Sequence, residues 1–178
     1  MTRTMASLRP RPRAVPPLLA IASAAAGGGA TLVITGRLLP AGLLGAAAVG
    51  ASILAGLGAR DSGEPRLVFA DHAVERLVEA ALFGSVAWST VPEEPWVAAA
   101  ALSALIASYL ASYLTAKATG LGFVVRERLP YRSVRPLLAV AGLLVPRLLG
   151  AALWAAAAIS LEPVLRHGRS VARQRDPA

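Results

Sequence analysis

Residues 52–79 read SILAGLGARDSGEPRLVFADHAVERLVE, and they join two apolar segments through a short polar break. The first part of this stretch, up to Arg60, consists mostly of small and apolar residues. After a short polar break an apolar run resumes, but it carries Asp71, Glu75 and Glu79 at intervals of four. On a helix this spacing places the three carboxylates on one face. Ionised groups are costly inside an apolar segment in lipid, so they indicate partners or a function.

The composition of the whole chain favours lipid as its surroundings. The 178 residues are 56% hydrophobic and only 16% charged, with a mean hydropathy of +0.59. Aromatic residues make up 5%, so large side chains do not dominate the packing. The absence of cysteine excludes disulfides and zinc-thiolate sites, and two histidines exclude a histidine-rich metal site. Oxygen ligands are the remaining candidates for metal binding.

The hydropathy pattern predicts an all-α, polytopic integral membrane protein with about six transmembrane helices. The first four apolar segments have nearly the ~20 residues needed to cross a bilayer, and the last two are shorter. An alternative is that the last two form one helix broken by Pro146. The predicted spans are 17–35, 38–59, 68–90, 95–116, 134–146 and 148–164.

The basic residues predict the orientation. Fifteen of the 18 lie in alternate segments between or beyond the spans, which indicates topology rather than nucleic-acid binding. The positive-inside rule then places both termini in the cytoplasm, with basic tails at 1–16 and 166–178 around a membrane domain at 17–165. The four segments contain Arg3, Arg9, Arg11 and Arg13; Arg60 and Arg66; Lys117, Arg126, Arg128, Arg132 and Arg135; and Arg166, Arg169, Arg173 and Arg175.

The N-terminal segment leaves two other interpretations open. An arginine-rich start before an apolar run is also typical of a secretory signal, and the lack of acidic residues in the first 60 is typical of a transit peptide. An uncleaved first span completes the even number of crossings. Arginine outnumbers lysine 17 to 1 in this alanine-rich chain, which favours a GC-rich bacterial genome and hence a bacterial plasma membrane.

The motif around Arg60 resembles the signature of the CDP-alcohol phosphatidyltransferase family, which runs D-x2-D-G-x2-A-R-x8-G-x3-D-x3-D. Gly56, Ala59 and Arg60 match its G-x2-A-R, Asp71 matches its third aspartate, and Glu75 stands at its fourth. The next residues, Arg76 to Glu79, resemble the D-R-x2-E/D run of such proteins.

A second part of the resemblance follows without a gap. Ser112-Tyr-Leu-Thr-Ala-Lys117-Ala-Thr-Gly-Leu-Gly is similar to the family's S-Y-x2-A-R/K-A-x-G-x-G, and Arg132 and Arg135 fall where an R-x2-R opens the fifth span. The resemblance covers about residues 38–165. This chain departs from the signature at Ser52 and Ala55, which replace the first two aspartates, at Leu67, which replaces a glycine, and in a spacing two residues short.

The resemblance implies a phosphotransferase of phospholipid biosynthesis. In such a family an alcohol hydroxyl attacks the β-phosphorus of a CDP-linked donor and CMP leaves, with Mg²⁺ or Mn²⁺ at the diphosphate. It implies metal ligation by Asp71 and Glu75, with Glu75 as general base, and a weak or absent metal site because two carboxylates are missing. It further implies nucleotide binding by Gly56, Ala59 and Arg60, and phosphate or acceptor binding by Ser112, Lys117, Arg132 and Arg135.

Three alternatives stay open at this stage. Asp61 and Glu64 in the short loop are candidate replacements for the missing metal ligands. The second alternative is that the chain is a catalytically inactive relative that binds lipid or a partner protein. A transporter with an acidic relay is disfavoured because nothing ionisable lies between Glu79 and Thr90. Membrane lipid and a CDP-linked donor are the expected partners, nucleic acid is not, and a homodimer is left open.

Overall fold

The computed structural model describes residues 11–124 and 129–174, and in the second range it describes side chains from residue 133 onward. Over these residues the chain forms six α-helices and two short 3₁₀ helices. They are η1 (Pro12–Ala14), α2 (Val15–Ile34), α3 (Leu38–Ser62), α4 (Pro65–Thr90), α5 (Pro95–Gly120), α6 (Leu129–Leu144), η2 (Pro146–Leu148) and α7 (Leu149–Arg173).

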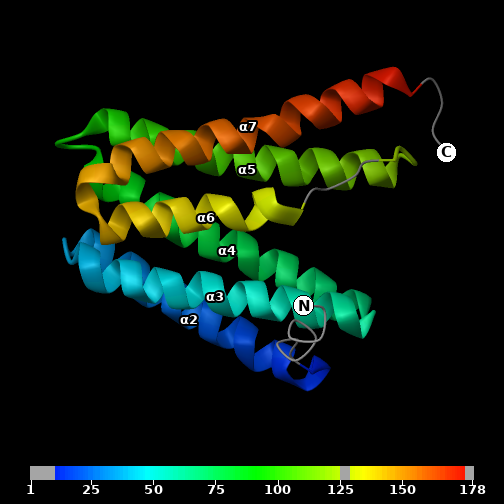
Figure 1. The fold of residues 1–178 in the computed structure, drawn as a ribbon, viewed down its shortest axis with the longest axis horizontal. Helices are drawn as coiled ribbons and strands as arrows, with labels where there is room; N and C mark the ends of the chain where they lie inside the picture. Colours follow the sequence, from blue (N-terminus) through cyan, green and yellow to red (C-terminus); the bar gives the residue numbers. More distant parts are fainter. Residues whose placement is uncertain (1–10, 125–128, 175–178) are drawn as a thin grey trace, which may run out of the picture.

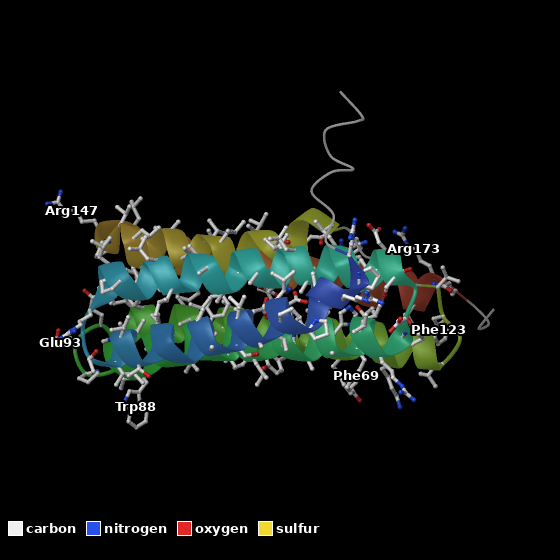
Figure 2. The ribbon with its side chains drawn as sticks, turned by 90° about the horizontal axis from the view of Figure 1, so that it is seen from below. Phe69, Trp88, Glu93, Phe123, Arg147 and Arg173 are labelled. Carbon is white, nitrogen blue, oxygen red and sulfur yellow. The ribbon has the colours of Figure 1, made fainter. Side chains whose placement is uncertain are left out.

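Successive helices run in opposite directions along one elongated bundle (Figure 1). One end, here called the N/C end, holds the start of α2, the α3–α4 turn, the end of α5, the start of α6 and the end of α7. The opposite end holds the α2–α3, α4–α5 and α6–α7 turns. Figure 2 shows Phe69, Phe123 and Arg173 toward the N/C end and Trp88, Glu93 and Arg147 toward the other. This alternation agrees with the predicted even number of crossings.

Proline and glycine set the turn between the two helices of the signature. Gly63 ends α3 in the left-handed conformation, with φ of 67°, which a residue with a Cβ rarely adopts. Glu64 is extended, as expected for a residue before proline, and Pro65 begins α4. The polar break therefore forms a tight turn that returns α4 along α3.

The structure confirms an all-α polytopic membrane fold. Within residues 11–124 and 129–174, four helical segments are long and apolar enough to cross a membrane, namely Pro12–Ile34, Leu38–Ser62, Pro95–Gly120 and Pro146–Arg173. Helix α4 is long but carries the charged stripe, and α6 is shorter, with an apolar part at Ser133–Leu144. The last two predicted spans are separate helices that meet at Pro146, so the single broken helix is wrong. Helix α7 continues through the first part of the predicted C-terminal tail to Arg173.

Small residues bring the helices close together. Leu144 lies so near Gly42 that an added Cβ would come within 2.8 Å of it, and Leu82 and Val140 lie near Gly45. The main core is rich in alanine and valine from α2 to α7. A second, smaller cluster near the N/C end joins α2 to α3 and contains Val15, Leu19, Ala55 and Ala59. We call it the α2–α3 cluster.

Candidate functional site

A pocket opens between α3, α4 and α6 in the half of the bundle nearest the N/C end. Its cavity volume is about 150 Å³, which is below the ~300–1,000 Å³ of typical small-molecule sites and therefore suits only part of a lipid. Helix α3 contributes both apolar and polar side chains to the lining, and α4 contributes the carboxylates. The lining residues are Val49, Ser52, Ile53, Gly56, Leu57, Arg60, Asp71, Glu75, Val78, Glu79, Ser133 and Pro136.

Gly56 allows Asp71 to approach the backbone of α3. Both carboxylate oxygens of Asp71 lie 3.1 Å from the position that a Cβ on Gly56 would take. Asp71 is almost fully buried, at 2% exposure. The close approach that sequence analysis expected for a nucleotide at this glycine is made here by a carboxylate of the neighbouring helix.

Arg76 binds the other two carboxylates of the acidic stripe. Its Nη2 lies 2.8 Å from Glu75 Oε1, and its Nη1 lies 2.7 Å from Glu79 Oε2. Ser108 of α5 donates a hydrogen bond to Glu79 Oε2 at 2.5 Å. The ring of Tyr109 lies 5.7 Å from the Arg76 guanidinium, and its hydroxyl donates to the Arg76 carbonyl oxygen. Arg76 is thus held in place from two helices.

Arg135 of α6 extends this network to a third helix. Its Nη2 lies 3.4 Å from Glu79 Oε1, and both side chains are buried. Glu79 therefore contacts groups from α4, α5 and α6, and its own exposure is 0%. A buried carboxylate in such a position is stable only when charges and donors surround it. Glu79 therefore links α4, α5 and α6 at the pocket lining.

The signature residues divide into two groups in the structure. Ser52, Gly56, Arg60, Asp71 and Glu75 all line the pocket, although they come from two helices separated by a turn. The alanines at the other signature positions do not line it.

Ala55 and Ala59 are fully buried in the α2–α3 cluster, against Val15 and Leu19. Asp61 and Glu64 are exposed near the α3–α4 turn, outside the pocket lining.

None of the expected phosphate-binding residues whose side chains the structure describes lines the pocket. Ser112 and Lys117 are exposed on α5 and are absent from the pocket lining. Arg135 is buried against Glu79. The side chain of Arg132 lies outside the described residues.

Sequence reasoning missed Ser108, which is the α5 contribution to the network. A signal was present, because Ser-Tyr-Leu occurs at 108–110 and again one helical turn later at 112–114. The family match selected the second copy, whereas the buried serine is the first.

The residues present do not fit a pair of divalent ions. Two ions bring a charge of +4, and four carboxylates normally balance it. Here Ser52 offers a hydroxyl and Ala55 faces α2, while Glu75 and Glu79 both contact Arg76. Among the described residues no group of three or more histidine, cysteine or acidic side chains is arranged to hold a metal ion.

Comparison with solved structures shows the fold to be that of a phospholipid synthase. Mycobacterium tuberculosis phosphatidylinositol phosphate synthase (PgsA1) in apo form has a TM-score of 0.74 and 21% identity, and the match covers 96% of this chain and 94% of that one. The form with CDP-DAG bound has a TM-score of 0.70 and 22% identity, with 97% and 92% covered.

The same synthase in complex with manganese and citrate has a TM-score of 0.68 and 22% identity, with 89% and 82% covered. No family profile and no curated protein sequence matches the chain. The likeness at this identity is a likeness of fold.

Proposed function

We propose that this protein binds a CDP-linked lipid donor in the pocket between α3, α4 and α6 and acts as a CDP-alcohol phosphatidyltransferase-like protein of phospholipid biosynthesis. One observation carries the proposal. The signature residues Gly56, Arg60, Asp71 and Glu75 line a single pocket, in a fold shared with a synthase whose structure has CDP-DAG bound.

The chemistry of the lining supports this class of ligand. Arg60 is the guanidinium that lines the pocket, and it suits a phosphate of the donor. The apolar side chains of Val49, Ile53 and Leu57 suit an acyl chain or the glycerol backbone. Glu75 is the candidate general base for the acceptor hydroxyl, and Asp71, against Gly56, is the candidate group that positions the donor.

The proposed setting is a bacterial plasma membrane with both termini in the cytoplasm. The N/C end of the bundle, which holds Arg60 and Arg66 beside the α3–α4 turn, Lys117 near the end of α5 and Arg173 at the end of α7, would then face the cytoplasm. This orientation places the pocket in the cytoplasmic half of the bundle.

A second candidate function is lipid binding without catalysis. It is favoured by one specific observation: Glu75, the candidate base, is in contact with Arg76 at 2.8 Å, so it is already engaged in an ion pair. The contact with Arg76 occupies a Glu75 oxygen that would otherwise accept the proton of an acceptor hydroxyl.

Donor binding is tested with purified protein in detergent. CDP-diacylglycerol is titrated against wild type, Arg60→Gln and Arg66→Gln. Arg66 is a matched control, because it is exposed at the start of α4 and does not line the pocket. Arg60→Gln should weaken binding about tenfold, near 1.4 kcal/mol, and Arg66→Gln should leave it unchanged. Equal affinity of all three proteins would refute donor binding in this pocket.

Catalysis is tested separately by release of CMP from CDP-diacylglycerol with a panel of alcohol acceptors. Turnover that Glu75→Gln abolishes would support the transferase. Binding without CMP release from any acceptor would favour the second candidate.

A further inference from the structure

The pocket's acidic side chains are balanced by guanidinium groups of the same chain. Three carboxylates line the pocket, from Asp71, Glu75 and Glu79. Two guanidiniums contact this set, Arg76 at Glu75 and Glu79 and Arg135 at Glu79. The five side chains together leave one net negative charge, and Arg60 on the lining can balance that charge.

Such a set is poorly matched to a divalent cation. A Mg²⁺ or Mn²⁺ ion must lose part of its hydration shell, which is favourable only when several carboxylate or phosphate oxygens replace the lost water. To bind Glu75 bidentately the ion would displace Arg76, which its own helix holds beside the carboxylate and which also contacts Ser108 and Tyr109 of α5.

Glu79 is still less accessible to an ion. Oε2 accepts from Ser108 and contacts Arg76, and Oε1 faces Arg135. Removing one partner of a buried charge pair costs about 3–5 kcal/mol, so replacing the arginine contacts of Glu79 by a metal ion is unfavourable.

We propose that Arg76 and Arg135 serve as the built-in countercharge of this pocket, so that the protein holds its lipid ligand without a divalent cation. The lipid part of this inference rests on the proposed function. The ligand class is an amphiphile with a phosphate-containing head group, which Arg60 contacts directly, and with its apolar part along the α3 wall. By contrast, one structure of the Mycobacterium tuberculosis synthase is a complex with manganese and citrate.

The metal part is tested on the free protein by electron paramagnetic resonance of Mn²⁺, in which bound ion loses the sharp signal of free ion. Wild type should leave the free signal unchanged. Arg76→Gln removes one guanidinium, which changes the net charge of the five side chains from −1 to −2. Two negative charges balance one Mn²⁺, so this variant should bind the ion. Arg66→Gln removes the same charge outside the pocket and should behave as wild type. Stoichiometric Mn²⁺ binding by wild type would overturn the proposal, even if Arg76→Gln fails to fold.

The ligand part is tested by titrating CDP-diacylglycerol in EDTA and in excess Mn²⁺. Equal affinity in the two buffers supports the proposal. At least tenfold tighter binding with Mn²⁺ overturns it but leaves the proposed function standing. No binding in either buffer overturns the proposed function, and the Mn²⁺ spectra of the free protein then decide the countercharge role alone.

Discussion

Ser52 and Ala55 stand where the signature has aspartates, and aspartate substitutions at these two positions should have different effects. Ser52 lines the pocket, whereas Ala55 is fully buried in the α2–α3 cluster beside Val15 and Leu19. From the sequence alone, both positions are expected to face Asp71 and Glu75. The structure predicts that Ser52→Asp creates a metal site and that Ala55→Asp mainly destabilises the fold.

The magnitudes follow from charge and burial. Ser52→Asp adds a carboxylate to the three carboxylates and two guanidiniums of the pocket, so their net charge changes from −1 to −2. Two negative charges balance one divalent ion. A new carboxylate ~4 Å from a divalent ion gains roughly 8 kcal/mol at an effective dielectric constant of 20, and dehydration of the ion offsets most of this gain. We expect at least a tenfold gain in Mn²⁺ affinity, about 1.4 kcal/mol. Ala55→Asp should cost on the order of 2–3 kcal/mol of stability, because it places a carboxylate among apolar side chains inside a span.

The assay uses each single variant and the double variant in the same detergent. Mn²⁺ affinity is measured by titration calorimetry, and stability by the temperature at which the monodisperse fraction falls by half in size-exclusion chromatography. The double variant should bind Mn²⁺ no better than Ser52→Asp and be as unstable as Ala55→Asp. Tighter Mn²⁺ binding by Ala55→Asp than by Ser52→Asp, with normal stability, would refute this assignment of the two positions.

Three further predictions concern the pocket, the buried network and the orientation. Gly56→Ala should displace Asp71 and weaken CDP-diacylglycerol binding in the titration above, whereas Gly50→Ala, on the same helix with nothing within 4 Å of the added Cβ, should leave it unchanged. Arg135→Ala should lower the free energy of unfolding by about 3 kcal/mol or more, because it leaves Glu79 without its α6 partner. Lys117→Ala, at an exposed position near the end of α5, should change the free energy of unfolding by no more than ~0.5 kcal/mol. Reporter fusions after Arg175 and within residues 61–66 should both report the cytoplasm, and an extracytoplasmic signal from either would refute the orientation.

Much of the fold was predictable from the sequence because lipid constrains it strongly. Apolar length identified the helices, and the short polar break after Arg60 indicated the loop between α3 and α4. The start of α6 was less predictable: it begins at Leu129, before the predicted span at 134, because a polar helical turn does not register in hydropathy. The same limit explains why the continuation of α7 to Arg173 was missed.

The candidate site was predictable only along each helix. The interval of four placed Asp71, Glu75 and Glu79 on one face, and in the structure all three line one pocket. Contacts between helices were not predictable, because periodicity does not say which neighbour a face meets. Ser108 and Ser112 share nearly one face of α5, yet the first is buried at Glu79 and the second is exposed.

The signature positions kept in this chain also have packing roles in the structure. A Cβ at Gly56 would lie 3.1 Å from the carboxylate oxygens of Asp71, so the Asp71 side chain would have to shift. Ala59 is fully buried in the α2–α3 cluster, so a larger residue there would separate these two helices. Ser52 and Ala55 need only be small for the same packing, and the carboxylates of the signature are not required there. Fold and metal chemistry therefore depend on different properties of one motif, the first on residue size and the second on charge. A chain of this kind can retain the fold and a small pocket between α3, α4 and α6 while its own arginines balance the carboxylates that remain.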